Sequence, residues 1–301
     1  MPLITQPEGL TTDQIAPSRR AALGLGAVGS LFFSAYAPAA LSQTAQPITT
    51  SSEGLTTAKV TYRAPDGFNL PAYVARPSGD GPFPVVIVVS EIFGVHEYIR
   101  DICRRLATSG YVAIAPAFFV READPAPLTD MQAIMQIVAK AGYEQVMGDI
   151  EATLNWLGTQ AFADTSKVGI TGYCWGGKVV WQAAARFDAI KAGVAWYGRL
   201  SPAATATEAQ VEAGQPWPID LAGDLKSPVI GLYGSEDGGI PNDTVEAMNA
   251  ALKAAGKTDS HITLYDGAPH GFHADYRASY READANHGWA RLLEHFSGHL
   301  R

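Results

Sequence analysis

Apolar residues along the chain follow two alternating periodicities from about residue 59 onward. Continuous runs such as PFPVVIVVSE predict strands that are buried on both faces, whereas the spacing in YIRDICRRLATSG predicts a helix. The stretch KVTYRAPDGFNLPAYVARP predicts a hairpin that turns at Asp66-Gly67. Because strands and helices alternate without a linker, the sequence predicts one α/β domain, with a mostly parallel sheet and helices on both faces.

Further strands and helices continue this alternation towards the C-terminus. The predicted strands are YVAIAP, SKVGITGYC, AGVAWYG, PVIGLYG and HITLYD, and the predicted helices cover 130–157, KVVWQAAARF, 242–255 and 283–299. A break near Gly142 allows the first of these helices to be two. The loop from Arg199 to Leu225 carries no pattern to which we assign chemistry.

The first 45 residues differ in kind from the rest of the chain. Ser18-Arg19-Arg20 precedes an uncharged run from Ala21 to Leu41, and small residues follow at 42–45. A charged start, an apolar middle and small residues at the end are typical of an export signal, and the paired arginines indicate the twin-arginine route. We therefore predict an exported, periplasmic protein whose precursor has the twin-arginine export machinery as its partner.

Cleavage near residue 45 would leave residues 46–58 as a polar lead-in to the domain over 59–301. The uncharged run is also close to the length of a membrane span, which needs about 20 apolar residues. An uncleaved N-terminal membrane anchor is therefore the first alternative, and a cytosolic protein with an accidental pattern is the second.

The net charge and the number of cysteines exclude some classes of function. The 301-residue chain has a formal net charge of −8 and no basic run outside the N-terminus, which argues against a nucleic-acid partner because phosphates require clustered Lys and Arg. Its two cysteines are too few for a disulfide framework. Cys103 shares helical spacing with apolar residues and is interpreted as a core residue, whereas Cys174 lies in a glycine-flanked turn. We expect a monomer or a small homo-oligomer.

The stretch TGYCWGGK, residues 171–178, fits two different kinds of site. It matches the first seven positions of a phosphate-binding loop, G-x-x-x-x-G-K-[ST], but Val179 stands where a hydroxyl must hold magnesium. Tyr173 and Trp175 are also bulky where phosphates need to approach the backbone closely. We therefore favour the second interpretation, a nucleophile turn.

A nucleophile turn, G-x-S-x-G, places its central residue on a sharp bend from strand to helix. Residues 172–176, GYCWG, have this pattern with Cys174 in place of serine, between an apolar strand and an Ala-rich helix. Such folds carry the nucleophile, an acid and a histidine in that order. Asp237 follows a predicted strand and His270 precedes the last helix, so loops at one sheet edge would bring both beside Cys174. Considered alone, Asp237 would be interpreted as a solvated turn residue and His270 as a loop histidine. Glu236 is the poorer candidate for the acid, because the loop geometry would direct its side chain outward.

Several longer segments resemble one family. GYCWGG, SEIFGVHEYIRD, YVAIAPAFF, GSEDGGIP and PHGF together make residues 59–301 similar to the dienelactone hydrolases (carboxymethylenebutenolidases). The resemblance implies a single-domain α/β-hydrolase fold with Cys174, Asp237 and His270 as the catalytic residues. It also implies that Glu91 pairs with the resting thiol and helps to deprotonate it, since an ordinary cysteine, with a pKa of about 8.5, is only a few per cent thiolate at neutral pH. Without the resemblance, Glu91 would be interpreted as a helix N-cap or a loop carboxylate.

An ester attacked by Cys174 forms an oxyanion, which preorganised N–H donors must stabilise. The residue after a nucleophile turn supplies one donor, here the backbone N–H of Trp175. The resemblance implies the N–H of Ile92 as the second. His270, oriented by Asp237, would then activate water to hydrolyse the thioester.

Substrate recognition departs from the family pattern. Dienelactone carries a carboxylate, which relatives bind with two arginines, and the resemblance places the first at Arg121. The second should lie four residues after His270, where this chain has Ala274, so Arg277 or His273 are candidates for that role. Surface charge is the alternative for both arginines. We expect no cofactor and no metal: His270 and His273 have a plausible spacing for ligands, but no acidic or cysteine partner converges on them in sequence.

The sequence therefore predicts hydrolysis of a small-molecule lactone or carboxylic ester through a cysteinyl acyl-enzyme. The leading reaction converts a dienelactone to a maleylacetate-type product. A broad-specificity small-ester carboxylesterase is the near alternative, and a catalytically inactive binding protein of the same fold is a third reading. A redox-sensing Cys174 is a fourth, although no resolving cysteine lies nearby in sequence.

Overall fold

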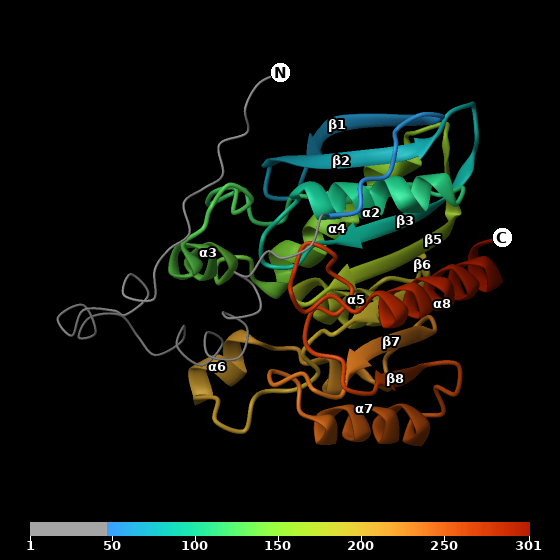
Figure 1. Ribbon diagram of the computed structural model, residues 1–301. Coiled ribbons are helices and arrows are strands. Elements are labelled where there is room, and N and C mark those ends of the chain that lie inside the picture. Colours follow the sequence, from blue (N-terminus) through green and yellow to red (C-terminus); the bar gives the residue numbers. More distant parts are fainter. Residues whose placement is uncertain (1–46) are drawn as a thin grey trace.

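The computed structural model describes residues 47–301, which form an eight-stranded sheet with helices around it (Figure 1). The strands are β1 (Leu55–Arg63), β2 (Asn69–Pro77), β3 (Phe83–Val89), β4 (Val112–Pro116), β5 (Ala163–Tyr173), β6 (Ile190–Trp196), β7 (Val229–Gly234) and β8 (His261–Tyr265). The helices are α2 (Glu97–Thr108), α3 (Met131–Val138), α4 (Tyr143–Gly158), α5 (Trp175–Arg186), α6 (Glu208–Ala213), the 3₁₀ helix η2 (Pro218–Leu221), α7 (Asn242–Ala254) and α8 (Glu282–Leu300). The predicted export signal, 1–45, lies outside the described residues. Between residues 47 and 301 no helix is long and apolar enough to cross a membrane.

The sheet is parallel except at one edge. Its strand order is β1-β2-β4-β3-β5-β6-β7-β8, and only the pairs β1/β2 and β2/β4 are antiparallel. The β1/β2 hairpin turns at Gly67, which has a φ of 82°, and Asp66 Oδ1 accepts the N–H of Phe68 at 3.0 Å. The predicted hairpin and mostly parallel sheet are both confirmed.

Helices cover both faces of the sheet, and two glycines show which helix lies on which face. A Cβ on Gly169 in β5 would meet Leu300 and Phe296 of α8, whereas a Cβ on Gly193 in β6 would meet Val180 of α5. Gly193 pairs with the residue after Gly169, and successive residues of a strand point to opposite faces. Helices α8 and α5 therefore pack on opposite faces, and Figure 1 shows α2 on the same side as α8.

The helical segment between β4 and β5 consists of two helices, α3 and α4, as the predicted break near Gly142 allowed. Gly142, with extended φ and ψ, is the N-cap of α4, and α3 ends shortly before it. The short helix α6 and the turn η2 were not predicted within the loop 199–225. Helix α6 is only 6 residues long and begins with a capping box between Thr207 and Gln210, so it offers too few apolar positions for a periodicity to show.

The carboxyl ends of the parallel strands all face one edge of the sheet. The loops that leave this edge carry Glu91 after β3, Cys174 after β5, Asp237 after β7 and His270 after β8. In open α/β sheets ligands bind at this edge, so the fold gathers the predicted site residues where a ligand is expected.

Candidate active site

Cys174 occupies a strained turn between β5 and α5. Its φ is 54° and its ψ is −115°, a backbone conformation that residues other than glycine rarely adopt. Its N–H donates to the carbonyl of Trp196 at 3.0 Å, and its own carbonyl accepts from Gly177 at 2.9 Å. The turn thus holds the thiol, which is partly exposed, at the top of the sheet.

The glycines around Cys174 allow strand and helix to approach closely. A Cβ on Gly176 would lie 2.7 Å from the carbonyl oxygen of Ser90 and would collide with that of Val89. A Cβ on Gly172 would collide with the backbone of Gly176. This is the geometry of a nucleophile turn, and it explains why both glycines of the pattern are required.

The structure brings Cys174, His270 and Asp237 together. His270 Nδ1 lies 2.6 Å from Asp237 Oδ2, both side chains are buried, and Cys174 is near enough to the imidazole to influence its pKa. Burial lowers the pKa of His270, but the charges of Asp237 and Cys174 outweigh it and raise the pKa to about 9. Glu236, the rejected acid, is exposed. The structure thus gathers the three groups of the predicted site, with the imidazole oriented by Asp237.

Glu91 lies in the same site but its carboxylate is engaged with other partners. Tyr276 donates its hydroxyl to Glu91 Oε1 at 2.8 Å, and Arg277 Nη2 is 3.9 Å from the same oxygen. His96 Nε2 is 3.1 Å from it, without the angle of a full hydrogen bond. Burial raises the pKa of Glu91, but the charges of His96 and Arg277 outweigh it and lower the pKa to about 2. The carboxylate is thus ionised, in the state the structure describes, and points its hydrogen-bonded oxygen at Tyr276.

The two backbone N–H groups predicted to stabilise an oxyanion have no backbone acceptor in the described part of the chain. Trp175 is the first residue of α5, whose first-turn N–H groups have no intrahelical acceptor. Ile92 follows Glu91 in the turn after β3. Among residues 47–301 neither N–H donates to a backbone carbonyl. Both sequence candidates for the oxyanion site are therefore available as donors.

The two candidate arginines have different surroundings. Arg277 is buried beside Glu91, and its guanidinium stacks on Phe93 at 5.0 Å. Arg121 instead uses four N–H groups on two carboxylates, those of Asp66 and Asp149, at 2.7 to 3.1 Å. Arg277 therefore lies in the site, whereas the guanidinium of Arg121 is engaged in ion pairs with Asp66 and Asp149. The substrate-binding role of Arg121 remains a prediction that this arrangement does not favour.

His273 is packed beneath the site. Its Nδ1 is 2.6 Å from the hydroxyl of Tyr98, and its ring lies 4.4 Å from that of Trp196. Burial, followed by the charge of Arg105, lowers the pKa of His273 well below its usual range. The imidazole is therefore neutral and supports the loop, rather than offering a charge to a substrate.

An apolar cluster borders the nucleophile. It consists of the buried residues Phe119, Met131, Ile134 and Val138, with Ile92, Phe93, Ile137, Ala141 and Trp175 packed against it. The rings of Phe119 and Trp175 have centroids 4.8 Å apart. Helix α3 thus provides an apolar surface next to the two candidate oxyanion donors, which suits the hydrocarbon part of a small substrate.

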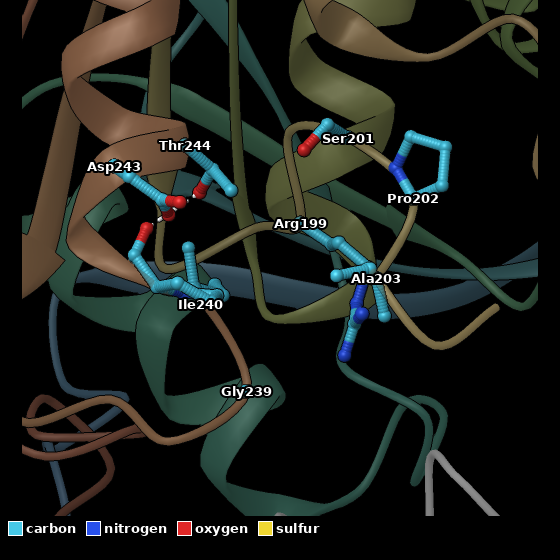
Figure 2. Close-up of a pocket in the computed structure, with 10 residues that line it drawn as sticks. Arg199, Ser201, Pro202, Ala203, Gly239, Ile240, Asp243 and Thr244 are labelled. Atoms are coloured by element: carbon cyan, nitrogen blue, oxygen red, sulfur yellow. Dashed lines mark hydrogen bonds between the residues drawn. The ribbon is translucent and has the colours of Figure 1, made fainter.

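A pocket of about 210 Å³ lies between the loops that follow β6 and β7 (Figure 2). Arg199 and Ser201 line one side, and Gly239, Asp243 and Thr244 line the other. The sequence did not predict this pocket, and it did not predict that His96 and Tyr276 contact Glu91. The only available signal was an arginine directly after the strand AGVAWYG.

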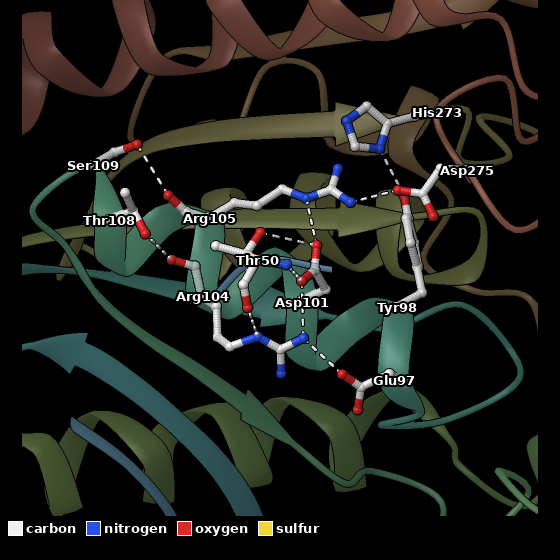
Figure 3. Close-up of polar contacts among 10 residues, drawn as sticks. All are labelled: Thr50, Glu97, Tyr98, Asp101, Arg104, Arg105, Thr108, Ser109, His273 and Asp275. Atoms are coloured by element: carbon white, nitrogen blue, oxygen red, sulfur yellow. Dashed lines mark hydrogen bonds and ion pairs between the residues drawn. The ribbon is translucent and has the colours of Figure 1, made fainter. Parts of the chain in front are cut away.

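A charge network ties the loop between β8 and α8 to α2 (Figure 3). Arg105 of α2 donates to Asp275 of that loop and, through Nε, to Asp101 at 2.6 Å. Asp101 also accepts from Arg104 at 2.8 Å and from the backbone N–H of Thr50 at 2.6 Å. The loop that carries the imidazole of the site is therefore held by buried charges on a neighbouring helix.

Residues 47–301 contain no group of three or more His, Cys, Asp or Glu side chains that could hold a metal ion. Cys103 is fully buried in α2, as expected for a core residue, and it forms no disulfide with Cys174.

Comparison with known proteins identifies similar chains. A Methylorubrum extorquens protein named "Putative carboxymethylenebutenolidase" is 47% identical over 250 residues, 83% of each chain. An Escherichia coli K12 protein of the same name is 46% identical over 265 residues, 87% of this chain and 94% of the other. The crystal structure of a "Putative Dienelactone Hydrolase" from Klebsiella pneumoniae superposes with a TM-score of 0.74 at 44% identity, covering 81% of this chain and 98% of that one.

The similarity to these proteins extends over the described α/β domain, and it confirms both the α/β-hydrolase fold and the family that the motifs predicted. Residues 70–300 match the model of the dienelactone hydrolase family, and the chain belongs to that family.

Proposed function

We propose that the protein hydrolyses a lactone or carboxylic ester through a thioester on Cys174. Membership of the dienelactone hydrolase family supports a hydrolase of this class. The observation that carries the cysteine mechanism is that His270, bound to Asp237 at 2.6 Å, lies near enough to Cys174 for the charges of the two groups to interact. Such an arrangement lets an imidazole accept the thiol proton and return it to a leaving group.

In the acylation step, the proton of Cys174 is held on His270, whose pKa is raised to about 9, and the thiolate attacks the acyl carbon. The oxyanion that forms is met by the N–H groups of Trp175 and Ile92. Collapse of this intermediate breaks the C–O bond, and His270 donates its proton to the leaving oxygen. For a lactone, the released hydroxyl remains part of the acyl group.

In the deacylation step, His270 removes a proton from water, which attacks the thioester carbon. The C–S bond breaks, the sulfur regains the proton, and the carboxylic acid leaves. Asp237 stabilises the imidazolium in both steps. We assign Glu91 an auxiliary role in thiol activation, which requires its side chain to leave Tyr276, because at a pKa of about 2 it is a weak base where it now lies.

The dienelactone-to-maleylacetate reaction is the leading specific activity, since the family and the relatives named for carboxymethylenebutenolidase point to a butenolide ring. Arg277, buried beside Glu91, is the arginine placed to meet a carboxylate near the thiol. The ion pairs of Arg121 reduce its availability for the same purpose, so a broader range of small esters is the second candidate.

The experiment is a comparison of the wild-type protein with Cys174→Ala on a dienelactone and on p-nitrophenyl acetate. The variant is expected to lose at least about a thousandfold in kcat on any ester that the wild type hydrolyses. Mass spectrometry of the wild type, quenched during turnover of p-nitrophenyl acetate, is expected to show an acetyl group on Cys174. Wild-type rates in the variant would contradict the mechanism, and no turnover of any ester would favour a binding protein.

A further inference from the structure

The pocket in Figure 2 has the position and size of a substrate subsite. It lies between two loops that leave the carboxyl ends of neighbouring parallel strands, β6 and β7. Ligands of open α/β sheets bind at this edge. Its volume of about 210 Å³ exceeds the ~150 Å³ of a cavity that holds benzene, so a single ring with a substituent fits.

Both walls of the pocket are connected to the proposed catalytic residues. Gly239, on one wall, donates its N–H to Asp237 Oδ1 at 2.9 Å. Arg199, on the other wall, follows Gly198, where a Cβ would lie 2.7 Å from the Cα of Gly177 in α5. The pocket therefore borders the acid that orients His270 and the helix that begins after Cys174.

The strand order places the pocket on one particular side of the thiol. Cys174 follows β5, Ile92 follows β3 on one side of it, and the pocket lies beyond β6 on the other side. If the carbonyl oxygen of an ester points at Ile92, the acyl chain and the alcohol part both extend away from β3, and the position of His270 distinguishes them. His270, which must protonate the leaving oxygen, also comes from that second side, after β8. The pocket is thus where the alcohol part of a bound ester would lie.

The lining of the pocket favours a negative group. Arg199 supplies a positive charge and Ser201 a hydroxyl, whereas the hydroxyl of Thr244 already donates to the carbonyl of Pro241 at 2.7 Å. The charge of Arg199 also contributes, after burial, to the lowering of the pKa of Lys178 to about 8, which shows that Arg199 acts on groups around the pocket. Asp243 lines the same pocket but is exposed at its rim.

We propose that this pocket is a leaving-group subsite, in which Arg199 binds a carboxylate carried by the alcohol part of the substrate. The inference rests on the proposed ester hydrolysis and extends it to a substrate class. An arginine fork matches a carboxylate in geometry as well as in charge. Asp243 lowers the affinity for the same group from the opposite wall.

The test uses two esters with the same acetyl group, 4-acetoxybenzoate and its neutral methyl ester, methyl 4-acetoxybenzoate. The measured quantity is the ratio of kcat/KM for the anionic ester to that for the neutral ester. In Arg199→Met this ratio is expected to fall at least about tenfold, mainly through KM. In Asp243→Asn it is expected to rise about two- to fivefold, and Arg199→Lys is expected to keep part of the preference.

Arg76→Met is the matched control, since Arg76 is also half-buried but stacks on Phe162 at the start of β5, at the opposite edge of the sheet. Its ratio is expected to equal that of the wild type. An unchanged ratio in both pocket variants, with esters still hydrolysed, would overturn the subsite and leave the proposed function intact.

If the wild type hydrolyses neither ester, the proposed function is decided by the dienelactone and p-nitrophenyl acetate assays, and binding decides the subsite. Calorimetric titration with 4-hydroxybenzoate is then expected to show at least about tenfold weaker binding to Arg199→Met than to the wild type. Equal affinities, or no binding to the wild type, would overturn the inference.

Discussion

Nδ1 of His270 lies 2.6 Å from Oδ2 of Asp237, and Oδ1 of the same carboxylate accepts the N–H of Gly239 at 2.9 Å. The side chains of His270 and Asp237 are 5% and 1% exposed, so water does not compete for either group. The carboxylate is therefore held from both sides, which fixes the orientation of the imidazole. The same contact makes the protonated imidazole more stable in the folded protein than in the unfolded chain.

This contact predicts a specific pH dependence of stability. The pKa of His270 is raised to about 9 in the folded protein, from an ordinary value of 6.5. A raised pKa contributes stability that is fully present below the unfolded value and is lost as the pH rises through the folded value. The free energy of unfolding in urea is therefore expected to decrease between about pH 6.5 and pH 9, and to decrease less in Asp237→Asn.

Subtracting the pH dependence of the free energy of unfolding in Asp237→Asn from that of the wild type isolates the contribution of His270. The pKa of Lys178 is lowered to about 8 by burial and by Arg199, so its contribution to stability increases with pH above that value and has the opposite sign. Both proteins contain Lys178, and subtraction removes its contribution. Parallel pH curves for the wild type and Asp237→Asn would contradict the assignment.

Close backbone packing at the nucleophile turn yields a second prediction. The Cβ of Gly176→Ala would lie 2.7 Å from the Ser90 carbonyl oxygen, and backbone atoms of β3 cannot easily move within a buried sheet. We expect a loss of about 3 kcal/mol or more in the free energy of unfolding, or failure to fold. Gly158→Ala in α4 is the control, because a Cβ there meets nothing within 4 Å, and it is expected to stabilise by up to about 1 kcal/mol. Equal effects of the two substitutions would show that the turn tolerates a side chain.

These glycines illustrate what the sequence could predict. The strand PFPVVIVVSE and the pattern of Gly172 and Gly176 are local, and a fully buried parallel strand and a sharp bend leave their mark in neighbouring residues. Chain order then located Asp237 and His270, because each follows its own parallel strand and parallel strands end at a common edge. The fold and the gathering of these residues were therefore accessible without coordinates.

The partners of long polar side chains were not accessible in the same way. Tyr276 binds Glu91 across 185 positions of sequence, and no periodicity links the two residues. The resemblance indicated a pairing of Glu91 with the resting thiol, whereas the structure directs its bonded oxygen to Tyr276. Flexible side chains choose partners by three-dimensional proximity, so a role at such a position needs the structure.

The network around Arg105 predicts control of the loop dynamics. Arg105→Met would leave the buried carboxylates of Asp275 and Asp101 without this cation. Asp275 would lose its tie to α2. We expect faster amide hydrogen exchange in residues 266–281, and a decrease in kcat of about tenfold, because small misplacements of catalytic groups are costly.

The control for this variant is Arg104→Met. Arg104 binds Asp101, Glu97 and Thr50 but not Asp275, so it is expected to lower stability without accelerating exchange in residues 266–281. Unchanged exchange in Arg105→Met would show that the loop is held by its aromatic contacts, such as that of His273 with Trp196.

The ion pair of Arg121 with Asp149 separates a structural role from a substrate-binding role. The Asp149 side chain is fully buried, and Arg121 makes two hydrogen bonds to it at 2.7 Å. Removing one partner of a buried pair leaves an uncompensated charge, so Arg121→Met is expected to lose roughly 3 kcal/mol in the free energy of unfolding. The double variant Arg121→Met with Asp149→Asn is expected to recover part of this loss, because it removes the orphaned charge. If Arg121 instead binds substrate, Arg121→Met would raise KM for anionic esters at unchanged stability, and the neutral amide at Asp149 would restore nothing. Urea unfolding and KM measured on the same preparations distinguish these outcomes.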